Sequence, residues 1–240
     1  MTANKLKLLA CLSMLIDHIT YVFIPRYLDI TEETENVWWY IGRGLGRSAF
    51  IIFAFLLVEG FFLTGNLKKY VLRMLLFAFI AEAPFDLLSN GRLDSDTFLA
   101  RQNVLFLFVL GLILMYVILY IEKLFSEKSQ PKYYILAACA CALAGLAAYF
   151  LRVDHGYPGL ALILVFFFFR KGGKRLILAV TVWSFACIAA GQMLEWAGLL
   201  ALIPIMYYNG EKGRGSKWFF YIFYPVHMLV LGLLYVYVIK

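Results

Sequence analysis

The segment LACLSMLIDHITYVFIP, residues 9–25, decides the class of fold. It belongs to an apolar run of about 20 residues, the length that an α-helix needs to cross the hydrocarbon core of a bilayer. Asp17 and His18 nevertheless lie inside it, where an ionisable side chain costs roughly 2.5–3.5 kcal/mol on insertion scales. A chain that retains both residues must give them partners or water within the membrane.

Similar apolar runs recur along the 240-residue chain, of which 63% is apolar and 15% is charged. Soluble domains carry about 25% charged residues, so this composition predicts an all-α, polytopic membrane protein. No long polar block separates the runs, and we expect one integral-membrane domain over residues 1–240. The four cysteines lie in apolar runs and form no disulfide or metal-binding motif, so we predict no metal site.

We expect nine membrane helices, with eight or ten as alternatives because two segments are short. The expected ranges are 6–25, 45–64, 70–88, 102–121, 133–151, 157–169, 175–191, 194–208 and 218–239. Lysines and arginines concentrate in alternate connections, whereas the connection at 26–39 is net acidic. By the positive-inside rule, the N-terminus is expected in the cytoplasm and, after nine crossings, the C-terminus outside. The net charge of +7 then reflects contact with anionic membrane lipid, and no nucleic-acid partner is expected.

Further ionisable residues lie inside the expected helices or at their ends. Arg43 and Arg47 share one face of the second helix, and Glu82 and Asp86 share one face of the third, because residues four apart on a helix are neighbours. Others of this kind are Glu59, Asp154, His155 and His227. Together they predict a hydrated, protein-lined cavity in which carboxylates and histidines transfer protons. For any single member, purely structural pairing between helices is the alternative.

Asp17 and His18 point in directions about 100° apart on a helix, so they cannot readily orient each other. His18 instead shares a helix face with Lys7, about 16 Å away. If His18 is a base, the carboxylate that orients it must come from another helix, and the candidates are Glu82, Asp86 and Asp154. We expect Asp17 to pair with Arg43 or Arg47.

Several segments together resemble the TraX family, whose namesake is the conjugation protein that N-acetylates F-pilin. They are LKLLACLSMLIDH (6–18), GRSAFIIFAFLLVEGFFLTGNLKKYVLRMLLFAFIAEAPFDLL (46–88), QNVLFLFVLG (102–111), DHGYPG (154–159) and YPVHM (224–228). The resemblance covers the chain from end to end, and it is most specific in the second and third expected helices.

The TraX family is in turn similar, more remotely, to membrane acyltransferases of the acyltransferase-3 and heparan-glucosaminide acetyltransferase type. In the acyltransferase-3 group the first helix carries a basic residue, ten intervening residues and a histidine. Lys7 and His18 stand at this spacing, with Lys in place of Arg. The segment at 61–73 also resembles the entry to the basic third-helix region of those enzymes, which implies a role in donor binding for Lys68, Lys69 and Arg73.

The resemblance implies a membrane-bound acyltransferase in a bacterial cytoplasmic membrane. It would move an acyl group, most simply acetyl from acetyl-coenzyme A, to an amine or hydroxyl of an acceptor at or across the membrane. His18 would deprotonate the acceptor or take the acyl group itself. The candidate catalytic residues are His18, Asp17, Glu82, Asp86, Asp154 and His227. The candidate residues for binding acyl-coenzyme A are Lys7, Arg43, Arg47, Lys68, Lys69 and Arg73.

Two other functions fit the same residues. A proton-coupled secondary transporter also places carboxylates and histidines near the middle of the membrane. A non-catalytic membrane assembly factor would use the buried charges only to hold its helices together. The sequence also leaves open the acyl group, the direction of transfer, the oligomeric state and the acceptor, for which a pilin-like peptide, a glycan, a cell-wall polymer and a lipid headgroup are candidates.

Overall fold

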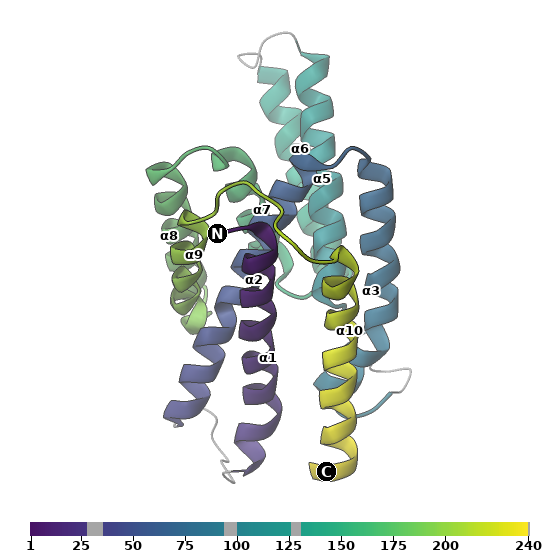
Figure 1. The fold of residues 1–240 in the computed structure, drawn as a ribbon. Helices are drawn as coiled ribbons and strands as arrows, with labels where there is room; N and C mark the ends of the chain where they lie inside the picture. The colour runs from purple at the N-terminus through teal and green to yellow at the C-terminus, as the bar shows by residue number, and fades with distance from the viewer. Residues whose placement is uncertain (28–35, 94–99, 126–130, 240) are drawn as a thin grey trace.

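The computed structural model describes residues 1–27, 36–93, 100–125 and 131–239 as a bundle of helices (Figure 1). Outside the helices, the described residues form connections with one isolated bridge between Gln102 and Val153. The helices are α1 (Ala3–Tyr27), α2 (Val37–Leu63), α3 (Leu67–Asn90), α5 (Val104–Leu124), α6 (Pro131–Phe150), α7 (Gly156–Phe169), α8 (Lys174–Ala189), η2 (Met193–Ala201), α9 (Leu202–Met206), α10 (Lys217–Leu234) and η3 (Tyr235–Ile239).

The prediction of an all-α membrane protein is confirmed for the described residues, and each of the nine expected ranges contains a helix. By length and composition, 5 of the described helices are able to cross a membrane: Ala3–Pro25, Val37–Leu63, Val104–Leu124, Pro131–Phe150 and Trp218–Val238. The number of crossings is therefore supported only in part. The other segments fall short because α3 carries several charges and because α7 has only 14 residues.

The eighth expected segment differs from a regular membrane helix in its geometry. It begins as the 9-residue 3₁₀ helix η2 and continues as the 5-residue α9. A 3₁₀ helix rises about 2.0 Å per residue, compared with about 1.5 Å in an α-helix. The tighter winding therefore lets a short segment reach further across the bundle than its residue count indicates.

The two chain ends lie at opposite ends of the bundle, as an odd number of passes requires (Figure 1). At the N-terminal end, the Ala3 amide donates to the Glu211 carbonyl (2.8 Å) and the Asn209 amide donates to the Met1 carbonyl (2.9 Å). The basic connection between α9 and α10 thus lies beside the N-terminus, as the charge alternation predicts. Most of the acidic connection, at 28–35, and Lys128 of the basic connection before α6 lie outside the described residues.

At the other end of the bundle, the connection before α5 pairs with the connection between α6 and α7. The Gln102 amide donates to the Arg152 carbonyl (3.1 Å), and the Asp154 amide donates to the Gln102 carbonyl (2.8 Å). This pairing fixes Asp154 next to the start of α5.

Glycines let α1 and α2 approach closely at the level of Asp17. A Cβ atom on Gly42 would overlap the Thr20 side chain, and one on Gly46 would overlap the Asp17 side chain. Only glycine leaves this space free, so these positions bring the buried acid of α1 against the arginines of α2. The apolar core lies beyond this contact, where α2, α5 and α7 pack together.

Candidate active site

A cavity of about 1430 Å³ lies between α1, α2, α3, α5 and α10. Its lining extends along α2 from Trp39 to Leu63, a rise of about 36 Å, which exceeds the roughly 30 Å of a bilayer's hydrocarbon core. The ionisable residues in the lining, apart from tyrosines, are Lys7, Asp17, His18, Arg43, Arg47, Glu59, Arg73, Arg101, Arg152, Asp154, His155, Glu195 and Lys212. A protein-lined cavity that contains buried ionisable residues, as the sequence predicts, is therefore present in the described part of the chain.

His18 lines this cavity. His227 of α10 contacts His18 but does not line the cavity, and it is 7% exposed. His18 Nδ1 lies 2.8 Å from His227 Nε2, and the two rings are within 3° of coplanar. His227 Nδ1 lies 2.8 Å from the carbonyl oxygen of Phe223, one helical turn earlier. Pro225, which lies between these two residues, has no N–H to donate to the Tyr221 carbonyl four residues earlier.

These contacts fix the tautomers of both imidazoles. The Phe223 carbonyl can only accept, so His227 Nδ1 carries a proton and, in the neutral ring, Nε2 accepts. His18 Nδ1 must then donate to His227 Nε2, which leaves His18 Nε2 as an unprotonated nitrogen. A basic lone pair is thereby available on the imidazole that lines the cavity.

The prediction that a carboxylate from another helix orients His18 is wrong, since His227 takes that place. Glu82 and Asp86 are buried at 2% and 1% exposure and do not line the cavity. Glu82 accepts from the Asn103 side-chain amide at the start of α5. This face of α3 packs toward α5 and α10, so its carboxylates are turned away from α1.

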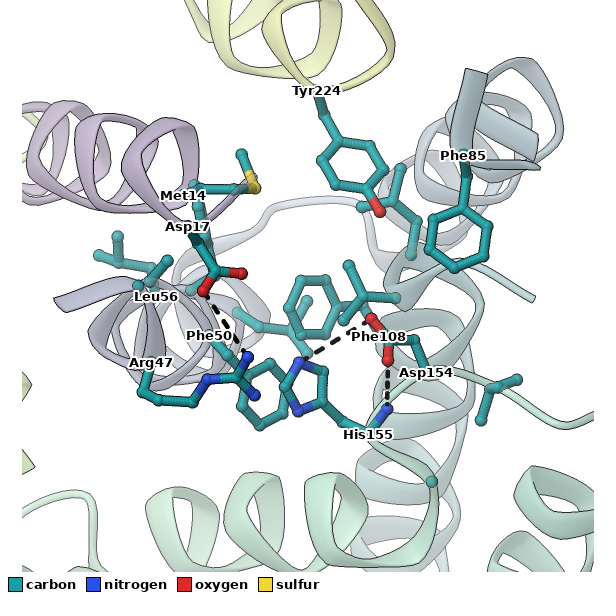
Figure 2. A pocket seen from close by; sticks show the side chains of 18 of the residues that line it. Met14, Asp17, Arg47, Phe50, Leu56, Phe85, Phe108, Asp154, His155 and Tyr224 are labelled. Carbon is teal, nitrogen blue, oxygen red and sulfur yellow. Dashed lines mark hydrogen bonds and ion pairs between the residues drawn. The ribbon is translucent and has the colours of Figure 1, made fainter. Parts of the chain in front are cut away.

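Asp17 pairs with both arginines of α2, which confirms its expected partners. Its Oδ2 lies 2.6 Å from Arg43 Nη1. Its Oδ1 lies 3.6 Å from Arg47 Nη2, an ion pair drawn in Figure 2. Arg47 also lies 3.3 Å from Glu195 of η2, and the Arg43 guanidinium lies over the ring of Tyr21, 5.1 Å from its centroid. Both arginines are therefore charge-paired, and their predicted contact with donor phosphates stays a prediction.

Asp154 and His155 form a second polar corner of the cavity, in the connection between α6 and α7. The Asp154 carboxylate pairs with Arg101 and accepts from the His155 backbone amide (3.0 Å). The His155 ring stacks on Phe50, with centroids 3.8 Å apart and planes within 6°. His155 has a φ of 60°, a conformation that costs energy in a residue with a side chain and that tends to occur at functional sites.

The pKa values at this corner keep one group charged and the other neutral. Burial raises the pKa of Asp154, but His155 and Arg101 outweigh this effect and hold the pKa below its usual value. Burial lowers the pKa of His155 against the opposing effect of the Asp154 charge. Near pH 7, Asp154 is thus ionised and His155 is a neutral imidazole.

Basic residues line the opposite, N-terminal end of the cavity. Lys7 Nζ lies over the Phe220 ring, 5.2 Å from its centroid, and Arg73 bonds to the Tyr221 hydroxyl. Lys212 lines the same end. Among the described residues, none of these three cations pairs with a carboxylate. The nearby Glu59 is instead bound through both oxygens by Arg170, at 2.5 and 3.0 Å.

The comparison with known proteins assigns the chain to a family. A family model described as TraX protein matches residues 2–235. The chain belongs to the TraX family. A curated relative of this TraX-family chain is the probable fimbrial assembly protein FimC, serogroup H1, of Dichelobacter nodosus, 28% identical over 251 residues that cover 96% of this chain and 94% of that protein. No solved structure matches the chain.

In this TraX-family protein, only part of the predicted set of site residues meets in one cavity. Those that line it are Lys7, Asp17, His18, Arg43, Arg47, Arg73 and Asp154. Those that do not are Lys68, Lys69, Glu82, Asp86 and His227. Lys68 and Lys69 are exposed at the start of α3, and His227 contacts His18 from outside the lining. Among the described residues, no group of three or more His, Cys, Asp or Glu side chains is arranged to hold a metal ion.

Several cavity residues of the TraX-family chain were absent from the predicted set. They are Arg101, Glu195 and Tyr224, together with His155, which was predicted to lie in the cavity but was given no catalytic or binding role. The residue His155 directly follows Asp154 in a glycine-rich turn, which was a signal for a shaped loop. The sequence around Glu195 did not indicate a functional site, because a single acidic residue in a short apolar segment is as often structural as functional.

Proposed function

We propose that this TraX-family protein is a membrane-embedded acyltransferase that moves an acyl group, most simply acetyl, from acyl-coenzyme A to an amine or hydroxyl. The observation that carries the proposal is the His18 imidazole in the cavity lining, whose Nδ1 is connected through His227 to the Phe223 carbonyl. An oriented imidazole of this kind suits proton abstraction from a nucleophile.

In the proposed reaction, His18 Nε2 accepts the proton of the acceptor's N–H or O–H group. The acceptor atom forms a bond to the acyl carbon, and the thioester C–S bond breaks. His18 then returns its proton to the leaving thiolate, so the imidazole is neutral again at the end of the cycle. Neutral His227 supports each step by accepting the hydrogen bond from His18 Nδ1.

The N-terminal end of the cavity suits the donor. Lys7, Arg73 and Lys212 provide positive charge there for the phosphates of acyl-coenzyme A, and these cations lack carboxylate partners among the described residues. Lys7 and His18 lie about 16 Å apart along α1, a separation that an extended pantetheine arm can bridge. Donor phosphates at Lys7 would therefore place the thioester near the base.

The acceptor would enter from the opposite end, where the Asp154 and His155 corner lies. With the N-terminus in the cytoplasm, donor and acceptor would approach from different sides of a bacterial cytoplasmic membrane. A pilin-like peptide is the acceptor we favour, because the relative from Dichelobacter nodosus is named a probable fimbrial assembly protein.

The name of that relative also supports a second candidate function, a membrane assembly factor without catalysis. Under this alternative, the bonds of His18, Asp17 and Arg47 would serve only to hold the helices together. The two functions differ in whether the protein consumes acetyl-coenzyme A.

The test uses protein purified in detergent micelles, with acetyl-coenzyme A as donor and a short peptide with a free N-terminal amine as acceptor. Calorimetry measures donor binding, thiol release reports cleavage of the C–S bond, and mass spectrometry reports the acetylated peptide. We expect His18→Ala to bind the donor but to lose about 10²–10⁴-fold in thiol release, the range typical of a general base.

The control is Cys139→Ala, which alters an exposed residue of α6 outside the cavity and should keep wild-type activity. Absence of donor binding, together with equal thiol release by wild type and His18→Ala, would rule out the enzyme and favour the assembly factor. Uptake of a labelled solute into proteoliposomes, without thiol release, would support a transporter.

A further inference from the structure

Tyr224 presents a buried hydroxyl group to the cavity. It lies on α10, is 8% exposed and belongs to the cavity lining. Figure 2 shows its hydroxyl directed into the pocket, toward the side where Phe108 and Asp154 lie. A phenol buried this deeply normally has a partner for its polar end, so the bonds of this hydroxyl bear on its role.

The backbone amide of Val104 lies near the Tyr224 hydroxyl and favours negative charge on its oxygen. Val104 is the first residue of α5, and its amide is one of the groups left without an intrahelical partner at a helix N-terminus. Among the described residues, none accepts the hydroxyl proton of Tyr224. The hydroxyl proton of Tyr224 is therefore available to a ligand in the cavity.

Tyr224 also lies near His227, which contacts the proposed base His18. It precedes His227 by three residues, so both lie on one face of α10, and their ring centroids are 5.9 Å apart. The same His227 holds His18. One turn of α10 thus positions a hydrogen-bond donor and, through His227, the proton acceptor of the proposed reaction.

We infer that Tyr224 donates its hydroxyl proton in a hydrogen bond to the carbonyl oxygen of the acyl group. This inference rests on the proposed function. When the acceptor atom bonds to the acyl carbon, the π electrons of the C=O bond move to oxygen, and the Tyr224 O–H group stabilises the resulting negative charge. When the C=O bond re-forms and the C–S bond breaks, Tyr224 still carries its proton.

Two further features support this role. The N-terminus of α5 lies behind the hydroxyl, and its partial positive charge favours a developing anion. The arginines that line the cavity near the base are less suited to it, because Arg43 and Arg47 bind Asp17 and Glu195, and Arg101 binds Asp154. The Tyr224 hydroxyl has no such competing acceptor among the described residues.

The first test is Tyr224→Phe, which removes the hydroxyl and keeps the ring. We expect the kcat of thiol release from acetyl-coenzyme A to fall roughly 10²–10³-fold, the usual loss for one oxyanion donor, with the KM unchanged. Tyr116→Phe is the matched control, since it removes the hydroxyl of an exposed tyrosine on α5 that lies outside the cavity; it should keep wild-type kcat.

The second test is Val104→Pro, which removes the backbone N–H that lies near the Tyr224 hydroxyl. Proline is favoured at the first position of a helix, and Asn103 before it already has the extended conformation (φ −66°, ψ 162°) that proline requires. Loss of this N–H group should lower kcat about 2–10-fold, the effect of one hydrogen-bond donor, and thermal unfolding in detergent should match wild type.

The outcomes separate the inference from the proposed function. If wild type releases thiol and Tyr224→Phe keeps its kcat within two-fold, the role of Tyr224 is overturned while the proposed function stands. A lower unfolding temperature with unchanged kcat would also overturn it, and would assign Tyr224 to capping α5. If wild type itself releases no thiol, the proposed function fails, and the role of Tyr224 fails with it.

Discussion

At the scale of single residues, Asp17 and His18 are neighbours in sequence with separate partners. Helix geometry was enough to predict this separation and the pairing of Asp17 with Arg43 or Arg47. It was not enough to identify the partner of His18, because that depends on how α10 approaches α1. A histidine in the last helix was visible in the sequence, but the contact that joins it to His18 is tertiary.

His227 is a positioning residue in this account, and its replacement tests the tautomer argument. His227→Leu should lower kcat about 10-fold or more with little change in KM, because His18 Nδ1 loses the acceptor that fixes its orientation. His227→Gln should restore part of the activity, since a side-chain carbonyl can accept the same hydrogen bond.

The measurement is thiol release across a range of pH for both variants. A purely structural role for His227 predicts equal activity per folded molecule in both variants. The positioning role predicts that glutamine exceeds leucine. Equal activity of the two variants would therefore contradict it.

At the scale of helices, the close approach of α1 to α2 and the pairing of connections determine which charged residues contact one another. The pattern of lysines and arginines predicted which connections lie together, and the bonds between the N-terminus and residues 209–212 agree with it. The sequence predicted that Glu82 and Asp86 share one face of α3. It could not predict that this face packs toward α5, because sequence spacing gives the face of a helix but not the neighbouring helix.

Gly46→Ala tests the approach of α1 to α2. The added methyl group would overlap the Asp17 side chain, so we expect a loss of about 1–3 kcal/mol in stability from overpacking and a lower unfolding temperature in detergent. Gly145→Ala is the matched control, because a Cβ there meets nothing within 4 Å. Equal unfolding temperatures for the two variants would show that the helices do not need this contact.

At the scale of the whole molecule, composition was sufficient to predict a helical membrane protein and a polar cavity within it. The number of crossings was not fixed, since 5 of the described helices meet the length and apolarity of a membrane span. Short segments such as α7 and η2 depend for their placement on the helices packed around them. The length of the cavity along α2 could not be predicted from the sequence either, because its walls are formed by residues from several packed helices.

The account predicts that the cavity connects a donor on one side of the membrane with an acceptor on the other. The most direct measurement uses sealed proteoliposomes, with acetyl-coenzyme A labelled on the acetyl group outside and a peptide with a free N-terminal amine inside. Wild type should place label on the enclosed peptide, and His18→Ala should not. Label that reaches the peptide only after the vesicles are permeabilised, or equally with His18→Ala, would contradict the account.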